Sequence, residues 1–360
     1  MRAVLMQDGK LRVDKVPEPV PGPGEVLVDV LACGICGSDL HCAAHGPAFN
    51  TALKGAVGAE LLDLSRPIVF GHEFVGRVVS YGPDTEARIP VGRRVVSMPM
   101  LLRDQPVLLG FAGPEAPGAY AERMLLSEPL LIEVPDHVPN DVAALTEPLA
   151  VAYRSVARAD LGGDDVPLVV GCGPIGLAVI AVLKMKGVGP IVASDFSPER
   201  RAIAQRLGAD VIVDPAAASP YEALVAAAAT DVTARMAAPT ALLGQLPIRP
   251  TVAFECVGAP GLIQQLIGGV PAGSRIVVAG INIASDHFEP AQAIFKELDI
   301  RFSLYYTPEQ FAATFTHLAS GDFDITALLT GTVGFDGVAD AFARLGTSPH
   351  DAKILLDPTR

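Results

Sequence analysis

Short apolar runs alternate with clusters of proline and glycine along the first 150 residues. The runs rich in strand-forming residues cover residues 2–6, 11–16, 25–32 and 74–79. Turn-forming clusters such as residues 19–24 separate them, and short apolar runs bounded by such clusters are typical of strands. The pattern predicts a β-rich region over residues 1–153.

From about residue 152 the pattern changes to apolar strands that alternate with helical stretches. The predicted strands cover residues 168–171, 191–195, 211–213, 251–255 and 275–280, with helices ending near residue 186 and covering 198–207. This alternation is typical of βαβ units, so residues 154–295 are predicted to form an α/β fold around a doubly wound parallel sheet. Residues 296–360 return to short mixed elements and end on a predicted strand over 352–356.

Composition and charge narrow the class of protein. Hydrophobic residues make up 50% of the 360 residues and charged residues 19%, which excludes a disordered chain. The formal net charge of −13 argues against a nucleic-acid partner and against an anionic membrane surface. Residues 215–248 are rich in alanine and are predicted to form one or two surface helices, interrupted by Pro220 and Pro239.

One uncharged stretch is long enough to be mistaken for a membrane span. Residues 166–183 carry no charge, and their length is near the lower limit for a spanning helix. Three glycines and a proline near the middle favour a buried strand, a tight turn and a buried helix instead. The N-terminus reaches Asp8 before any apolar run of signal-peptide length, so no secretory segment and no membrane association are predicted.

The cysteines indicate a reducing compartment. They are odd in number and unevenly spaced, which disfavours a disulfide framework. Their positions are Cys33, Cys36, Cys42, Cys172 and Cys256. We therefore expect free thiols and a cytoplasmic location.

A glycine-rich turn follows the first strand of the α/β region. Gly171, Gly173 and Gly176 fit the pattern G-x-G-x-x-G between a predicted strand and a predicted helix. In that context the glycines allow a tight turn and let a pyrophosphate approach the helix N-terminus. Asp195 ends the next strand 19 residues after Gly176, where a carboxylate accepts hydrogen bonds from ribose hydroxyls. The alternative is a turn that serves packing alone.

The residues around Asp195 bear on the choice between NAD and NADP. Asp195 would repel a 2′-phosphate, and Phe196 and Ser197 follow it instead of a basic residue, which favours NAD. Arg200 and Arg201 are close enough in sequence to approach a phosphate, so NADP stays the less favoured alternative. The residues predicted to bind the cofactor are Gly171, Gly173, Ile175, Gly176, Asp195, Arg200, Val257, Gly280 and Ile281.

Metal-binding residue types gather in the β-rich region. Cys36, His72 and Glu73 are candidate ligands there, and Glu147 is a further candidate along the chain. Thiolate, imidazole and carboxylate together suit Zn²⁺, and three protein ligands with one open position define a catalytic zinc site. The wide sequence separation of these residues indicates ligands that converge through the fold.

Three alternatives compete with a catalytic metal. Cys33 and Cys36 have the C-x-x-C spacing of a redox pair, although they lie outside a βαβ context. The same pair, with Cys42 or His45, has ligand types suited to a structural zinc knuckle, but the sequence has no second C-x-x-C pair. His72 taken alone is typical of a buried core histidine.

Several sequence blocks resemble the zinc-containing medium-chain alcohol and polyol dehydrogenase family, especially its polyol, sorbitol-like and butanediol-like members. The similarity extends nearly from end to end of the chain. The matching blocks are GICGSDLH (34–41), GHEFVGRVV (71–79), GAYAE (118–122), TEPLAVA (146–152), GCGPIG (171–176), SDFSPERR (194–201) and AKILLDP (352–358). The resemblance implies a GroES-like catalytic domain formed by residues 1–153 and 296–360 around a Rossmann NAD-binding domain over 154–295.

The resemblance also assigns the candidate metal ligands. It implies that Cys36 and His72 bind zinc, and that Glu73 either binds zinc directly or lies next to the ligands. Glu147 would bind zinc or hold the metal-bound water. Asp39 would orient the imidazole of His72, because metal-bound histidines usually donate their other ring N–H to such a partner.

Two departures from the family pattern refine these expectations. Many members carry a structural zinc bound by four cysteines, but residues 97–117 contain no cysteine, so one catalytic zinc and no structural zinc are expected. Polyol-specific members tend to have an arginine near the substrate, where this chain has Leu304, Tyr305 and Tyr306. A highly hydroxylated sugar alcohol is therefore less favoured as substrate. By analogy, the protein is expected to be a homodimer or homotetramer.

The implied reaction transfers hydride between NAD and a primary or secondary alcohol, or a diol, and yields an aldehyde or ketone. Zinc would act as a Lewis acid on the oxygen of the small-molecule alcohol or ketone substrate. Ser38 would pass the alcohol proton toward the cofactor ribose and His41, whose ordinary pKa suits an outer relay step. Ser38, His41 and Glu73 are thus the predicted catalytic residues.

Three other functions stay open from the sequence. A zinc-free quinone or enoyl reductase and a catalytically silent NAD-binding protein would share the same fold. A thiol–disulfide protein would lose its redox activity on Cys33→Ser. A zinc site predicts instead that Cys36→Ser abolishes turnover, whereas Cys33→Ser has a mild effect.

Overall fold

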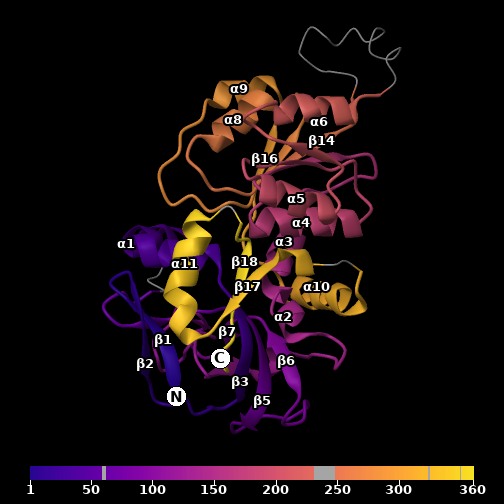
Figure 1. The fold of residues 1–360 in the computed structure, drawn as a ribbon. Coiled ribbons are helices and arrows are strands. Elements are labelled where there is room, and N and C mark those ends of the chain that lie inside the picture. The colour runs from indigo at the N-terminus through magenta and orange to yellow at the C-terminus, as the bar shows by residue number, and fades with distance from the viewer. Residues whose placement is uncertain (59–61, 231–247, 323–324, 349) are drawn as a thin grey trace. The chain divides into compact units, whose positions relative to one another are not determined.

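The computed structural model describes residues 1–58, 62–230, 248–322, 325–348 and 350–360. These residues divide into two compact units. Figure 1 colours the ribbon by residue number, from indigo at the N-terminus to yellow at the C-terminus. The first unit comprises Met1–Glu147, Thr307–Gly321 and Leu329–Arg360, and the second comprises Pro148–Tyr306 and Asp322–Leu328. Both ends of the chain therefore fold into one unit, and the middle of the chain forms most of the other.

A seven-stranded sheet organises the first unit. Its strands are β3 (Glu25–Gly34), β5 (Glu73–Tyr81), β6 (Arg94–Ser97), β9 (Arg123–Ser127), β10 (Leu131–Glu133), β17 (Leu329–Val333) and β18 (Lys353–Leu356). They are ordered β10-β6-β5-β3-β18-β17, and β9 also pairs with β3. The strand β3 therefore joins the N-terminal part of the sheet to the C-terminal strand β18, with which it pairs antiparallel.

Two smaller sheets complete the first unit. One has the order β2-β1-β4 and the other pairs β7 with β8. The strands are β1 (Arg2–Gln7), β2 (Lys10–Lys15), β4 (Ile68–Val69), β7 (Met100–Leu101) and β8 (Val107–Leu108). The four strands predicted for this region correspond to β1, β2, β3 and β5, so their existence is confirmed and their bounds differ by one or two residues.

A long helix in the first unit escaped the sequence prediction. This helix, α1 (Gly37–Val57), follows Cys36, whose backbone N–H donates to Oδ2 of Asp39 at 3.1 Å. It is irregular at His45 and contains Pro47, so its apolar positions lack clear helical periodicity. The other helical segments of this unit are η1 (Glu128–Leu130), α2 (Asn140–Ala143), α10 (Pro308–Ser320), η4 (Phe335–Gly337) and α11 (Val338–Thr347). Most of α3 (Thr146–Arg158) and all of η3 (Thr326–Leu328) belong to the second unit.

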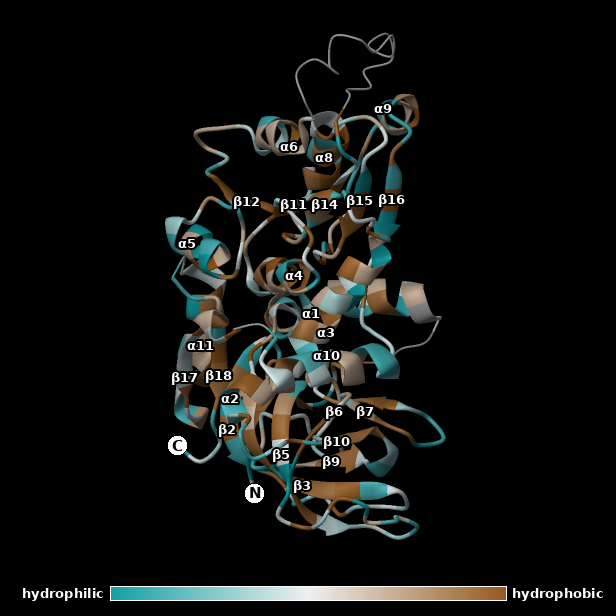
Figure 2. Ribbon diagram, turned by 90° about the vertical axis from the view of Figure 1, so that its right-hand side faces the viewer, coloured by the Kyte–Doolittle hydropathy of each residue, from teal (hydrophilic) through white to brown (hydrophobic). Residues whose placement is uncertain are grey.

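The second unit contains a parallel six-stranded sheet. Its strands are β11 (Val166–Val170), β12 (Val192–Ser194), β13 (Val211–Val213), β14 (Thr251–Glu255), β15 (Arg275–Val278) and β16 (Asp299–Phe302). They are ordered β13-β12-β11-β14-β15-β16, with β11 and β14 at the centre (Figure 2). This order is that of the doubly wound dinucleotide-binding fold, which confirms the predicted fold class.

Helices connect the strands of the second unit. They are α4 (Pro174–Met185), α5 (Pro198–Arg206), α6 (Pro220–Ala228), α8 (Leu262–Gly269) and α9 (Pro290–Phe295). The sheet continues to β16, beyond residue 295 where the sequence analysis ended the domain. This strand pairs parallel with β15. The sequence analysis did not include it because its residues alternate between charged and apolar and form no continuous apolar run.

Two sequence predictions about the second unit have different outcomes. Pro220 begins α6 and does not interrupt it, so that prediction was wrong, because a proline in the first turn of a helix sacrifices no helical hydrogen bond. Pro239 lies outside the described residues. The uncharged stretch 166–183 forms β11, a turn and most of α4, as predicted. In the described part of the chain, no helix combines the length and the apolar character needed to cross a membrane.

Candidate functional site

Three candidate metal ligands come together where β3 and β5 lie side by side. Cys36 precedes α1, Glu73 begins β5 opposite Gly34 of β3, and His72 directly precedes Glu73. Ligand atoms of Cys36, His72 and Glu73 all lie within 4.8 Å of one another. His72 and Glu73 are buried and Cys36 is partly exposed, so the group is open toward Cys36.

Each ring nitrogen of His72 faces an oxygen of a neighbouring side chain. Nδ1 lies 3.4 Å from Oδ1 of Asp39, and Nε2 lies 3.4 Å from Oγ of Ser38. The ring also stacks on Phe111, with the two ring centroids 5.3 Å apart. Burial by itself lowers the pKa of His72, but the negative charges of Asp39 and Cys36 outweigh it and raise the pKa well above its ordinary value. The surroundings of this ring thus favour a positive charge, which a bound proton or a metal ion can supply.

Asp39 is in turn fixed by two donors. Its Oδ2 accepts hydrogen bonds from the backbone N–H of Cys36 and from the hydroxyl of Tyr120, the latter at 2.9 Å. Its Oδ1 and the Nδ1 of His72 are buried, and neither makes a hydrogen bond of full geometry. A metal on Nε2 would fix the ring hydrogen on Nδ1, where Asp39 is the available acceptor. The surroundings of His72 therefore fit a metal-binding histidine.

Glu73 has a partner that the sequence analysis did not single out. Both of its carboxylate oxygens lie 2.7 Å from Nζ of Lys353, the first residue of β18. Lys353 also donates to the backbone carbonyl of Ile35 at 3.0 Å. Glu73 and Lys353 are each only 1% exposed in their side chains, so this is a fully buried ion pair.

The donor set suits zinc in its chemistry. Sulfur, imidazole nitrogen and carboxylate oxygen are the three ligand types that Zn²⁺ takes in proteins. Cys36, His72 and Glu73 supply one of each, and they are the one group of three or more His, Cys, Asp or Glu side chains at this spacing among the described residues. The residues present therefore fit a catalytic zinc better than a closed structural site, which would need a fourth protein ligand.

The remaining predicted residues of this region lie at different positions around the group. Glu147, in the first turn of α3, is buried and lies outside the group of three, but its charge helps to raise the pKa of His72 after the larger effects of burial, Asp39 and Cys36. His41 lies on α1 and is partly exposed.

The buried cysteines disfavour the two thiol alternatives. Cys33 is inaccessible, and burial raises the pKa of its thiol well above the ordinary value, which suppresses the thiolate that a redox pair requires. Burial likewise raises the pKa of Cys42 to about 12. Neither residue belongs to the group around Cys36, so a zinc knuckle built from these cysteines does not form.

The glycine-rich turn in the second unit joins β11 to α4. Gly176 packs so closely that a Cβ there would lie 1.8 Å from the carbonyl oxygen of Gly171. At Gly173, by contrast, an added Cβ would meet no atom within 4 Å. Close packing therefore requires glycine at position 176, whereas Gly173 borders open space. In dinucleotide-binding folds the pyrophosphate lies at this turn. Ile175 lies in the first turn of α4 beside them.

Asp195 follows β12 and caps this turn. Its Oδ2 accepts the backbone N–H of Cys172 at 2.7 Å, and its Oδ1 accepts that of Ser197 at 2.8 Å. Arg201 is not free to approach a phosphate, because its guanidinium binds the carbonyl oxygens of Asp195 and Phe196 and pairs with Asp214.

Two further loops lie at the carboxyl ends of β14 and β15. Val257 and Ile281 are exposed there. A Cβ on Gly280 would lie 2.2 Å from the backbone nitrogen of Gly258, so the two loops touch backbone to backbone. Glu255, which the sequence analysis missed, accepts the N–H groups of Val257 and Gly258 at 2.8 Å. Ligands of open α/β sheets bind outside these strand ends, so the predicted residues lie where a dinucleotide would be expected.

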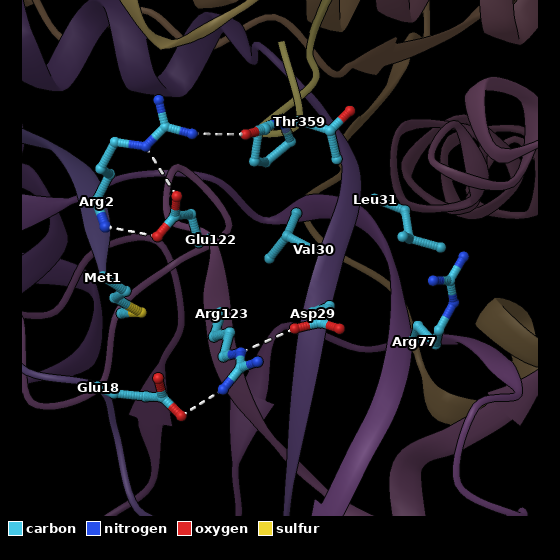
Figure 3. Close-up of a pocket in the computed structure, with 11 residues that line it drawn as sticks. Met1, Arg2, Glu18, Asp29, Val30, Leu31, Arg77, Glu122, Arg123 and Thr359 are labelled. Carbon is cyan, nitrogen blue, oxygen red and sulfur yellow. Dashed lines mark hydrogen bonds and ion pairs between the residues drawn. The ribbon is translucent and has the colours of Figure 1, made fainter.

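A surface hollow of about 450 Å³ in the first unit is lined by several charged side chains (Figure 3). Arg2 pairs there with Glu122, and Arg123 pairs with Glu18 and Asp29. The charges of Arg2 and Arg123 are thus balanced by neighbouring carboxylates, and none of the predicted site residues lines the hollow. We assign it no role in the chemistry.

Around the Cys36, His72 and Glu73 group, the sequence reasoning missed Tyr120 and Lys353. Both lie in blocks that match the family, GAYAE and AKILLDP. The available signal for Lys353 was a single charge inside the otherwise apolar strand pattern of residues 352–356. A charge in a buried strand requires a partner, but its identity depends on which strands become neighbours.

Comparison with known proteins covers both units. Residues 22–136 match the alcohol dehydrogenase GroES-like domain, and residues 174–320 match the zinc-binding dehydrogenase family. The (R,R)-butanediol dehydrogenase of Bacillus subtilis is 33% identical over 370 residues, which cover 99% of this chain and 100% of the relative. Human sorbitol dehydrogenase is 29% identical over 351 residues, which cover 94% of this chain and 90% of the relative.

A solved structure gives the same result. The X-ray structure of 2R,3R-butanediol dehydrogenase from Bacillus subtilis superposes with a TM-score of 0.79 at 31% identity and covers 99% of both chains. The GroES-like domain, the parallel Rossmann sheet and the Cys/His/Glu group define a metal-dependent oxidoreductase. The chain belongs to the zinc-binding medium-chain dehydrogenase family. It is an NAD(P)-dependent dehydrogenase acting on CH–OH donors, of the alcohol and polyol dehydrogenase type.

Proposed function

We propose that the chain binds one catalytic zinc ion through Cys36 and His72, with Glu73 and Glu147 as the carboxylates of the site, and no structural zinc. The observation that carries this proposal is the grouping of the Cys36, His72 and Glu73 ligand atoms within 4.8 Å. When bound, zinc supplies Lewis-acid stabilisation of the negative charge that develops on the substrate oxygen.

In this proposal, Ser38 and His41 remove the hydroxyl proton of the substrate. Oγ of Ser38 lies 3.4 Å from Nε2 of His72, so it is next to the ring atom that would bind the metal. Ser38 accepts the substrate proton and donates its own toward His41 on the same helix. Burial and the nearby His45 lower the pKa of His41, so the neutral form that can accept a proton dominates at pH 7. NAD⁺, when bound, would accept the hydride of the substrate carbon, which would become a carbonyl, while the proton leaves through His41.

The proposed cofactor is NAD, with Gly171, Gly173, Ile175 and Gly176 at the pyrophosphate. Asp195 supports this preference because its carboxylate repels a 2′-phosphate, and the guanidinium of Arg201 is occupied by backbone carbonyls and Asp214. Arg200, Val257, Gly280 and Ile281 complete the proposed cofactor site.

The proposed substrate class is a small secondary alcohol or vicinal diol. The similarity to butanediol dehydrogenase supports a diol. Leu304, Tyr305 and Tyr306, which stand where polyol-specific members tend to have an arginine, support a substrate with fewer hydroxyls than a sugar alcohol.

A combined metal and substrate measurement tests the proposal. We expect about one zinc per purified chain, and formation of reduced cofactor that is faster with NAD than with NADP. The substrate panel contains simple secondary alcohols, vicinal diols, polyols and aromatic alcohols. A chain that binds no zinc but reduces quinones or enones would instead be a zinc-free reductase. A chain that forms no reduced cofactor with any alcohol would be a catalytically silent NAD-binding protein.

Self-association and location are further parts of the proposal. The strand β16 is an edge of the parallel sheet, and Phe302 on it is 64% exposed. Leu304 and Phe295 nearby in sequence are also exposed, and such apolar surface supports association of two copies into a homodimer, or two dimers into a homotetramer. Light scattering of the purified chain measures this state directly. The unpaired cysteines support a cytoplasmic location.

A further inference from the structure

The ion pair between Glu73 and Lys353 spans three strands of the seven-stranded sheet. In strand order, β3 lies between β5, which carries Glu73, and β18, which carries Lys353. The carboxylate of Glu73 lies over Gly34 of β3, since a Cβ at that position would lie 1.9 Å from Oε2 of Glu73. The missing side chain of Gly34 thus creates the space in which the carboxylate and the ammonium group touch.

All the hydrogen-bonding capacity of the ammonium group is used. A lysine has three donors, and Lys353 lies within hydrogen-bond distance of both oxygens of Glu73 and of the carbonyl oxygen of Ile35. Both oxygens of Glu73 are engaged at 2.7 Å by this single cation. A buried ion pair is a weak contributor to stability, because desolvation of two charges offsets their attraction. Stability alone therefore gives a poor account of why the pair is present.

The same carboxylate faces the metal-binding group. One of its oxygens lies within 4.8 Å of the ligand atoms of Cys36 and His72. A metal ion at this position and the ammonium group of Lys353 would attract the same negative charge from two sides. They would also repel each other as like charges, and the burial of Lys353 leaves little water to screen that repulsion.

We propose that Lys353 is a positioning residue that competes with the bound metal for the carboxylate of Glu73. It weakens Glu73 as a ligand, lowers the affinity of the site for the metal, and keeps a ligand position accessible to the substrate. This inference rests on the metal site of the proposed function.

Zinc affinity of the full-length protein, measured by competition with a chelator, tests the proposal. Lys353→Met removes the ammonium group and keeps most of the side-chain volume, so we expect zinc to bind about tenfold more tightly or better. Glu73→Gln leaves the buried ammonium group without its counter-charge, so we expect zinc to bind about tenfold more weakly or worse. Equal or weaker zinc binding by Lys353→Met would overturn the proposal.

Cobalt substitution supplies a readout that is independent of activity. With Co²⁺ in place of zinc, Lys353→Met should change the visible d–d bands, because Glu73 then binds the metal more fully. The change should disappear in the double variant Lys353→Met/Glu73→Gln, whose spectrum should match that of Glu73→Gln alone. A spectrum of Lys353→Met identical to that of the unmodified protein would assign Lys353 a structural role only.

Control variants separate this effect from general destabilisation. Lys353→Arg keeps the charge and should retain the cobalt spectrum. Lys296→Met removes a lysine of the second unit that binds three backbone carbonyls, so it should cost stability without changing zinc affinity. If Lys353→Met does not fold, Lys353→Gln supports the same measurement, because its amide can still donate to Glu73 without a charge. Failure of the unmodified protein to bind cobalt through a thiolate would refute the proposed metal site itself, and not this inference alone.

Discussion

The hydroxyl of Tyr120 donates a 2.9 Å hydrogen bond to Oδ2 of Asp39 inside the core of the first unit. The other oxygen of Asp39 lies 3.4 Å from Nδ1 of His72, so Tyr120 acts on the histidine through the carboxylate. Burial raises the pKa of Asp39, while the nearby His72, the backbone N–H of Cys36 and Tyr120 oppose that effect. The three side chains form a chain of contacts that orients the imidazole.

Asp39→Asn should weaken zinc binding by about 10- to 100-fold, because the amide is a poorer acceptor for the imidazole N–H. Tyr120→Phe should have a smaller effect of the same sign and reduce the free energy of unfolding by about 1–2 kcal/mol. Tyr81→Phe is the matched control, since its hydroxyl also donates a hydrogen bond, in this case to the backbone carbonyl of Ile89. The control should lose similar stability in a thermal melt while its zinc affinity is unchanged. Equal zinc affinity in all three variants would contradict the orienting role of Asp39.

The two cysteines of the C-x-x-C pair should respond differently to substitution. Cys36→Ser removes a predicted metal ligand, so turnover should be lost. The affinity for zinc should fall by more than about 100-fold, which is the largest loss expected when a residue that only hydrogen-bonds to a ligand is removed. Cys33→Ser places a hydroxyl in a fully buried position and should cost about 1–3 kcal/mol of stability with turnover retained. Zinc content and initial rates distinguish the two outcomes. The reverse pattern would favour thiol–disulfide chemistry.

Gly34→Ala should displace Glu73, because the new methyl group would lie 1.9 Å from Oε2. We expect a loss of about 1–3 kcal/mol in the free energy of unfolding, as for other overpacked core positions, together with altered zinc affinity. Gly37→Ala is the control, since a Cβ there meets no atom within 4 Å. Denaturant melts of the two variants compare the positions. Equal stability of Gly34→Ala and Gly37→Ala would mean that Glu73 relaxes without cost.

The pH dependence of alcohol oxidation should report on His41. Burial and His45 lower its pKa, so the residue is neutral at pH 7 and becomes protonated only below the ordinary histidine range. Protonated His41 cannot accept a proton, so kcat/KM should fall as the pH decreases through this lowered pKa. His41→Gln should reduce the rate near neutral pH and remove that acid limb from the profile. An unchanged profile would assign the limb to another group.

The sequence by itself determined the local elements whose signals are contained in a few consecutive residues. Residues 168–176 predicted a strand and a glycine-rich turn, and β11 with the turn before α4 agrees with that prediction. The helix α1 escaped because Pro47 and the irregular His45 obscure the helical period of a segment that tertiary packing stabilises. The metal-binding residue types could also be selected from sequence, because Cys36, His72 and Glu73 have the chemistry that zinc requires.

Only the tertiary structure decided which charged side chains become partners in ion pairs. Lys353 and Glu73 are 280 positions apart, and they meet because β3 pairs with both β5 and β18 across the space left by Gly34. Arg201 likewise pairs with Asp214, which follows the next strand, β13, of the parallel sheet. Residue types and short-range periodicity specify strands, turns and ligand chemistry. The pairing of buried charges depends on strand order, which no short segment of the chain contains.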